Sequence, residues 1–146
     1  MPPEGNDLGS PQDWLARARS NLSLARTLKT EDILWEDLCF QLQQAVEKSI
    51  KGVLLHCGVI FPYVHNISQL ITLLKTSGIP WLEELDAAAD LTEYAVEMRY
   101  PGFPEEAVEE DYRQALAIAE RVVAWAETII NEANSATAQS PETGES

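Results

Sequence analysis

Basic residues and cysteines are scarce in this sequence. Ten lysine and arginine residues stand against 24 aspartate and glutamate residues, so the formal net charge is −14. Such a field repels polyanions, and we therefore do not expect bulk binding of nucleic acid through a basic patch. The two cysteines, Cys39 and Cys57, are too few for a disulfide framework and fall inside apolar helical stretches. We expect both to be buried free thiols in a reducing cytoplasm.

Signatures of membrane, secreted and metal-dependent proteins are also missing. No apolar run approaches the roughly 20 residues that span a bilayer, and the N-terminal stretch lacks the basic and apolar regions of a signal peptide. There is no glycine-rich phosphate loop, no nucleophile elbow and no HExxH motif. His56 and His65 have no cysteine or carboxylate neighbours at metal-ligand spacing. We therefore expect no metal ion and no cofactor, and a nucleotide is the one ligand left open.

Helical periodicity is what the sequence does contain. Apolar residues recur every three or four positions in five segments, and no useful stretch alternates in the manner of a β-strand. Short connections between amphipathic helices favour antiparallel neighbours. The sequence thus predicts an all-α fold, a five-helix up-and-down antiparallel bundle. The expected helices cover about residues 11–28, 32–58, 66–78 and 80–95, with the last beginning near residue 106.

Local signals place several helix ends and the domain limits. Ser10 and Asp13 form a capping-box pattern around a proline, Asn66 is a candidate N-cap, and Gly58 and Gly78 are candidate helix stops. Residues 1–9 are rich in proline, glycine and acid and are predicted to be a disordered lead-in. The predicted folded domain covers residues 10–132, and residues 133–146 are predicted to be a disordered acidic tail.

The densest polar string within a predicted helix is QQAVEKSIK at residues 43–51. Gln44, Lys48 and Lys51 are spaced to line one side of that helix. Glu47 lies four residues before Lys51, the favourable orientation for a surface ion pair. One interpretation is a solvated face with a single weak pair, which spacing alone favours. The other is a line of ammonium groups that meets a phosphate or an acidic partner.

A family resemblance rests on strings that occur in a fixed order. They are QQAVEKSIK at 43–51, His65-Asn66-Ile67 before a leucine-rich helix, and Arg99-Tyr100-Pro101, accompanied by segments 22–25, 91–94 and 115–119. Over roughly residues 12–130 the sequence resembles a HEPN domain, named for higher eukaryotes and prokaryotes nucleotide-binding. The resemblance implies a five-helix bundle that is commonly dimeric. It also implies a frequent partnership with a minimal nucleotidyltransferase encoded next door.

Many members of this family are RNases, whose signature is an arginine followed after four to six residues by a histidine. Counting from Arg99, that histidine would fall at Pro104, Glu105 or Glu106, and no histidine follows Arg99 anywhere. Lys51 to His56 is the nearest imitation, but lysine replaces the arginine and the pair lies on another helix. We therefore expect no RNase activity from the arginine–histidine signature.

The leading hypothesis is a non-catalytic HEPN-type module that binds a nucleotide, a minimal nucleotidyltransferase, or both, in a toxin–antitoxin-like system. Two alternatives stay open, namely an RNase toxin with a rearranged active site and a dimeric structural scaffold. The family resemblance implies that the assembly is a homodimer. The candidate residues for a nucleotide or anion site are Gln44, Lys48, Lys51, His65, Arg99 and Tyr100.

Overall fold

The computed structural model describes residues 9–95, 101 and 106–145, and the side chains considered below belong to residues 9–94, 101 and 106–131. Its elements are α1 (Pro11–Ala25), α2 (Trp35–His56), α3 (Ile67–Thr76), the 3-10 helix η2 (Glu83–Ala95) and α4 (Glu109–Glu145). No strand occurs in the described part of the chain. The predicted all-α, five-helix bundle is confirmed.

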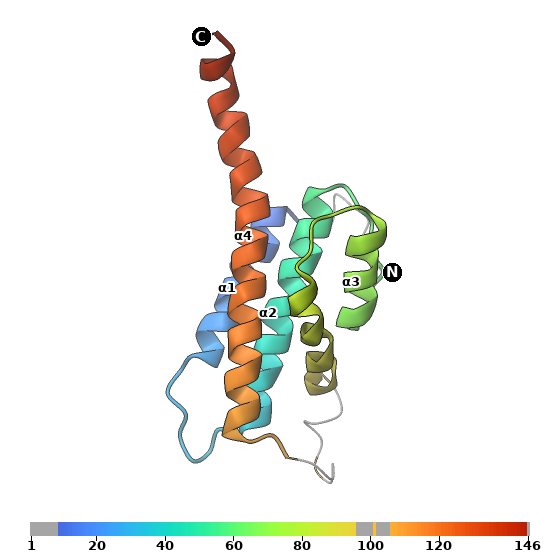
Figure 1. The fold of residues 1–146 in the computed structure, drawn as a ribbon. Coiled ribbons are helices and arrows are strands. Elements are labelled where there is room, and N and C mark those ends of the chain that lie inside the picture. The colour runs from blue at the N-terminus through green and yellow to red at the C-terminus, as the bar shows by residue number, and fades with distance from the viewer. Residues whose placement is uncertain (1–8, 96–100, 102–105, 146) are drawn as a thin grey trace.

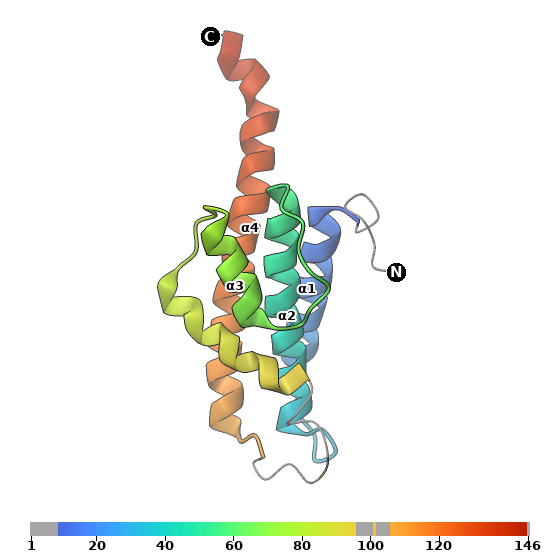
Figure 2. The ribbon, with the colours of Figure 1, turned by 90° about the vertical axis from the view of Figure 1, so that its right-hand side faces the viewer.

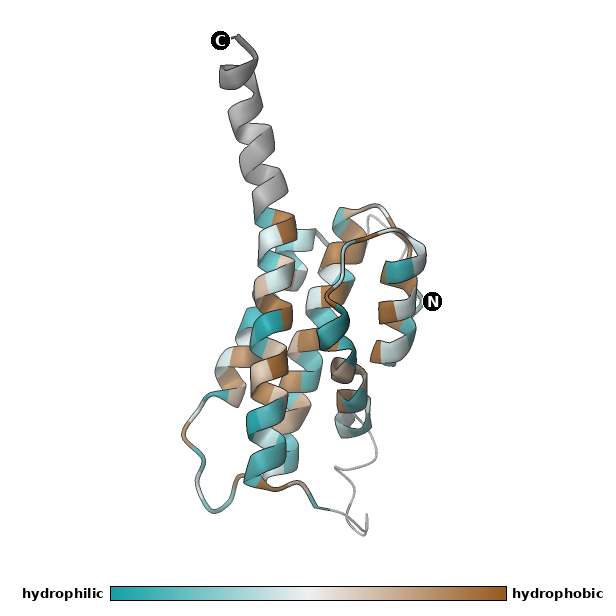
Figure 3. Cartoon of the chain, viewed as in Figure 1, coloured by the Kyte–Doolittle hydropathy of each residue, from teal (hydrophilic) through white to brown (hydrophobic). Residues whose placement is uncertain are grey.

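Helix α2 is the centre of the bundle. It packs against each of the other helices, with α1 and α4 on one side and α3 and η2 on the other (Figures 1 and 2). α1 runs antiparallel to both α2 and α4, while η2 crosses them at a slant (Figure 2). Apolar residues gather on the sides of the helices that face one another, as the hydropathy colours show (Figure 3). Burial of these sides supplies the main stabilisation of the fold.

The contact between α1 and α2 is unusually close at Gly52. A Cβ atom at this position would lie 3.1 Å from Trp14 Cβ and 3.4 Å from the carbonyl oxygen of Pro11. Both distances are at or below the normal packing limit for a methyl group. Gly52 therefore lets the start of α1 approach the end of α2, which brings Trp14 close to the polar residues of α2.

The predicted helix ends are formed by the local signals that indicated them. Ser10 Oγ accepts a hydrogen bond from the Asp13 backbone at 3.1 Å, and the Asp13 carboxylate accepts one from the Ser10 backbone at 2.9 Å. These two bonds lower the pKa of Asp13. Asn66 caps α3 by accepting from the Gln69 backbone at 3.1 Å. Gly58 and Gly78 follow α2 and α3 with φ of 76° and 74°, the left-handed region that glycine favours.

Helices α2 and α4 both start later than the sequence predicts. α2 begins at Trp35 rather than near Asp32, because Ile33 first donates to the Thr30 carbonyl oxygen in a turn. α4 begins at Glu109 rather than near residue 106, because the Asp111 carboxylate accepts from the Val108 backbone at 2.8 Å, which is one half of a capping box.

Cys57 also differs from expectation. It follows the last residue of α2 and is exposed, whereas Cys39 is buried as predicted, and both thiols are free. Apolar periodicity placed both residues on the core side of the helix. The helix ends before Cys57, so the periodicity no longer determines where this side chain lies.

The fourth helix differs in type as well as in its start. It was expected to be an α-helix opened by Pro80, and it is a 3-10 helix that starts at Glu83. Its buried residues recur at intervals of three, at Leu85, Ala88, Leu91 and Tyr94. A 3-10 helix has three residues per turn, so it aligns these four side chains in one row against the bundle. An α-helix would spread the same residues around its axis.

Helix α4 extends past the other helices towards the C-terminus (Figure 1). Its backbone continues to Glu145, through the segment predicted as a tail, so the domain limit at residue 132 stays a prediction. None of the helices in the described part of the chain combines the length and apolar character needed to cross a membrane.

We expect Leu85→Ala to lower the free energy of unfolding by about 2–5 kcal/mol, because the substitution leaves a cavity beneath the row of buried η2 residues. Leu85 is 1 % exposed, whereas Leu28 is 89 % exposed and provides a matched control. Leu28→Ala should change stability by no more than about 0.5 kcal/mol. Urea unfolding monitored by circular dichroism measures both. Equal stabilities of the two variants would contradict the packing described for η2.

Candidate functional site

A buried carboxylate organises the polar residues of α2. Glu47 is 3 % exposed. Its Oε2 accepts a hydrogen bond from Lys51 Nζ at 2.9 Å, and its Oε1 accepts one from Gln43 Nε2 at 3.0 Å. His65 Nδ1 lies 3.0 Å and 3.1 Å from the two carboxylate oxygens. Three side chains thus compensate the loss of hydration, which a buried charge requires.

Lys51 is buried together with its partner. Its ammonium lies 5.9, 5.6 and 6.0 Å from the ring centres of Trp14, Phe61 and Tyr63. Aromatic faces attract a cation at these distances. The Glu47–Lys51 pair predicted from spacing is therefore present, but it lies in the interior and not on a solvated face. Glu47 neutralises the charge of Lys51, so this lysine is placed to hold the carboxylate.

Lys48 differs from Lys51 because its ammonium has no carboxylate partner among the described residues. It is half-buried, and its Nζ donates to Asn21 Oδ1 of α1 at 2.9 Å. Partial burial lowers the pKa of Lys48, Glu47 opposes this shift, and the positive charges of Arg17 and Lys51 add to it. An ammonium has three hydrogens, so two remain for a ligand. Arg17 and Lys48 are thus two neighbouring cations that repel each other.

A chain of hydrogen bonds connects Gln44 to this cluster. Gln44 Nε2 donates to Gln43 Oε1 at 2.7 Å, and Gln43 in turn donates to Glu47. At the other end of the chain is His65, whose side chain is 61 % exposed. Tyr63, two residues earlier in the same loop, is also exposed. We call the surface formed by these and the neighbouring cations the polar face; its members are Arg17, Gln44, Lys48, Tyr63 and His65.

The structure accounts for part of the predicted site. Gln44, Lys51 and His65 join one hydrogen-bonded cluster around Glu47. Lys48 lies beside this cluster and bonds to Asn21 of α1, whereas Arg99 and Tyr100 lie outside the described residues. The contributions of Gln43, Arg17 and Tyr63 were not predicted from the sequence. Gln43 carries a signal in the spacing, because Gln43, Glu47 and Lys51 recur every four residues. Arg17 has no comparable signal, since its place depends on how α1 packs on α2.

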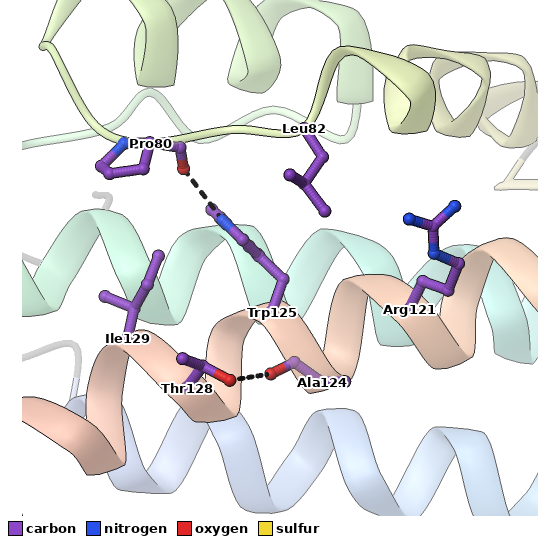
Figure 4. A pocket seen from close by; sticks show the side chains of 7 residues that line it. All are labelled: Pro80, Leu82, Arg121, Ala124, Trp125, Thr128 and Ile129. Carbon is purple, nitrogen blue, oxygen red and sulfur yellow. Dashed lines mark hydrogen bonds between the residues drawn. The ribbon is translucent and has the colours of Figure 1, made fainter.

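An apolar groove lies between α4 and the segment before η2 (Figure 4). Its volume is about 540 Å³, and its lining comes from the segment before η2 and from α4, namely Pro80, Leu82, Arg121, Ala124, Trp125, Thr128 and Ile129. Trp125 Nε1 donates to the Pro80 carbonyl oxygen at 2.9 Å, which fixes the indole at the groove wall. Arg121 is paired with Glu84 at 2.9 Å. The groove suits contact with another apolar surface, and its lining contains few polar groups that could bind or convert a ligand.

No group of three or more histidine, cysteine, aspartate or glutamate side chains within the described residues is arranged to hold a metal ion. The carboxylates nearest the polar face are already engaged, Glu47 by its three donors and Asp13 by the α1 cap. What the polar face offers is cationic and neutral donors, an imidazole and an exposed aromatic ring. That set of groups suits an organic anion.

We expect Lys51→Met to lower the free energy of unfolding by about 3–5 kcal/mol, because it leaves the buried Glu47 carboxylate without its cation. Replacing both residues, as Glu47→Gln/Lys51→Met, removes the two charges at nearly constant volume and should restore much of the loss. Lys75→Met is the control, since Lys75 pairs with Asp86 on the surface, and it should cost less than about 1 kcal/mol. Urea titrations compare the three. Equal costs for Lys51→Met and Lys75→Met would show that burial of the pair is unimportant.

Comparisons with known proteins agree with this architecture. The HEPN domain profile matches residues 11–129. The crystal structure of TT1696 from Thermus thermophilus is 28% identical, with a TM-score of 0.70 over 82% of this chain and 97% of that chain. ST0689, described as an archaeal HEPN homologue, is 29% identical, with a TM-score of 0.65 over 84% of this chain and 98% of that chain. A search of curated proteins gives no match. The chain belongs to the HEPN domain family.

Proposed function

We propose that this chain is a non-catalytic HEPN-type module that binds a nucleotide through its phosphate groups at the polar face. The observation that carries the proposal is the pair of neighbouring cations Arg17 and Lys48. Neither forms an ion pair with a carboxylate in the described part of the chain, although the protein carries a net charge of −14. The carboxylates whose charge acts on them, Asp13 and Glu47, are held by the α1 cap and by Lys51. Cations that repel each other on an acidic protein are stabilised by an anion placed between them.

The side chains of the polar face suit the parts of a nucleotide. Lysine offers a compact charge and arginine a planar fork, and both bind phosphate well. The exposed ring of Tyr63 gives a surface on which a base can stack. Gln44 and His65 add neutral polar groups at the same surface. Arg99 and Tyr100 remain proposed members of the site on the basis of the family resemblance alone.

A minimal nucleotidyltransferase is the protein partner that we propose, within a toxin–antitoxin-like system. Its support is the membership of the HEPN family. The absence of a histidine after Arg99 supports a binding role over RNA cleavage. A nucleotidyltransferase uses nucleoside triphosphates as substrates. A phosphate-binding face on this module could therefore bind the same class of molecule as its partner.

We also propose that two copies associate through the outer face of α4. Between residues 114 and 128 the two carboxylates of this helix, Glu120 and Glu127, are paired with arginines of α1. The most exposed positions in this stretch are Gln114, Ala117, Arg121, Ala124 and Thr128. In a chain of net charge −14, such a strip is where two copies meet with least repulsion. The apolar groove beside Trp125 borders the same strip and would be covered by the second copy.

We expect Arg17→Ala/Lys48→Ala to weaken the binding of ATP or GTP at least about tenfold, because each substitution removes a charged donor to phosphate. Calorimetry at two salt concentrations measures this, and wild-type affinity should fall as salt rises. Lys75→Ala/Arg113→Ala removes the same charge from surface pairs elsewhere and should leave binding unchanged. If both double variants bind equally well, or if the wild type binds neither nucleotide, the proposed site is wrong.

Light scattering on a sizing column should report about twice the chain mass of 16.2 kDa for the wild type. Ala124→Glu places a carboxylate in the middle of the α4 strip and should shift the protein to a monomer through repulsion and steric clash. Ala16→Glu adds the same charge at an exposed position of α1 and should leave the dimer intact. A wild-type monomer, or a dimer that survives Ala124→Glu, would contradict the proposed interface.

A further inference from the structure

The orientation of His65 is fixed from one side only. Its Nδ1 contacts both oxygens of Glu47, and its backbone carbonyl oxygen accepts from Gln43 Nε2 at 3.4 Å. The ring is otherwise open, with 61 % of the side chain exposed. Within the described residues, Nε2 has no hydrogen-bond partner. His65 therefore presents one ring nitrogen to solvent in a direction set by a buried carboxylate.

The contact with Glu47 also selects the tautomer of His65. An ionised carboxylate only accepts hydrogen bonds, so Nδ1 must carry the proton. The same carboxylate also accepts from Lys51 Nζ at 2.9 Å. In the neutral imidazole, Nε2 is then an unprotonated acceptor. Glu47 is a positioning residue for this nitrogen, in the same way that carboxylates behind metal-binding histidines fix the tautomer of those rings.

An exposed acceptor is unexpected at a surface whose charged groups are donors. Arg17 and Lys48 can only donate, and they suit phosphate oxygens. A phosphate group without bound protons only accepts hydrogen bonds, and Nε2 in this tautomer also only accepts. The two therefore cannot form a hydrogen bond with each other. The ligand that satisfies both kinds of group combines phosphate oxygens with a neutral donor. In a nucleotide the neutral donors are the ribose hydroxyls and the N–H groups of the base, and the proposed stacking of the base on Tyr63 leaves the ribose hydroxyls for His65.

We infer that His65 Nε2 accepts a hydrogen bond from one of the two ribose hydroxyls, so that the polar face binds a nucleotide with that hydroxyl more tightly than the analogue that lacks it. This inference rests on the proposed nucleotide binding and adds the sugar to it. Gln43 and Glu47 hold the acceptor in place, while Arg17 and Lys48 hold the phosphates. The preference has the size of one neutral hydrogen bond, about fivefold in affinity.

Two variants of His65 separate the roles of its nitrogens. His65→Asn places an amide nitrogen where Nδ1 lies, so it retains the donor to Glu47 and removes the outward acceptor. His65→Gln reaches the position of Nε2 and supplies an amide oxygen there. Calorimetry at pH 8, where an ordinary imidazole is neutral, would compare ATP, 2′-deoxy-ATP, 3′-deoxy-ATP and inorganic tripolyphosphate. Unfolding curves of both variants verify that the fold is kept.

We expect the wild type to bind ATP about fivefold more tightly than one of the two deoxy analogues. His65→Asn should lose this difference while its affinity for tripolyphosphate stays the same, and His65→Gln should retain part of it. Equal binding of ATP and both deoxy analogues by the wild type would overturn the inference and leave the phosphate site standing. Failure to bind even tripolyphosphate would overturn the proposed function, and the inference with it.

Nitrogen-15 NMR of the imidazole tests the tautomer without any ligand. At pH 8 we expect His65 to show a protonated Nδ1 and an unprotonated Nε2 in the wild type. In Glu47→Gln/Lys51→Met the carboxylate and its cation are both gone, and the tautomer ratio should move towards that of a free imidazole. A wild-type His65 with its proton on Nε2 would overturn the inference whatever the binding data show.

Discussion

Burial of the Glu47 carboxylate constrains the rest of the polar face. An isolated charge in the interior costs several kcal/mol, so the fold must supply donors to it. Gln43 and Lys51 do so from α2 itself, and His65 does so from the loop that precedes α3. The loop is thereby held against α2 at a defined point. The exposed imidazole takes its direction from an interaction that lies beneath the surface.

The cluster can exist only because of how the helices pack around α2. Gly52 admits the start of α1 at close range, and Trp14 of α1 then lies over the Lys51 ammonium together with Phe61 and Tyr63. These rings exclude water, which strengthens the attraction between Lys51 and its carboxylate. Apolar packing and the buried charge pair are therefore not separate features of the bundle. Apolar packing removes water from Glu47 and Lys51, and each buried charge then requires the other as a partner.

The acidic character of the protein gives its few cations distinct roles. Arg19 and Arg26 of α1 pair with Glu127 and Glu120 of α4 at 2.6 Å each, which links the outer helices across their shared surface. Lys51 is neutralised by Glu47. Lys29 has no carboxylate partner among the described residues, but its ammonium lies 4.9 Å from the ring centre of Trp35. Arg17 and Lys48 also lack such a partner there, and they lie beside each other, so an anion bound at the polar face would be stabilised by both charges. The net charge of the whole chain says nothing about this local arrangement.

The sequence by itself determined the features that depend on neighbours within one helical turn. These include the Ser10 capping box, the Asn66 cap, the stops at Gly58 and Gly78, and the helical class of the fold. It also indicated that Glu47 and Lys51 pair, because both lie on one helix.

Only the tertiary structure decided whether that pair faces water, since periodicity shows which residues share a side and not what covers that side. The same holds for Arg17 and His65, which reach the cluster from segments distant in sequence. The buried residues of η2 recur every three positions in the sequence, a spacing that occurs in both helix types. The helix type appears only in the folded structure, where η2 packs against α2, α3 and α4.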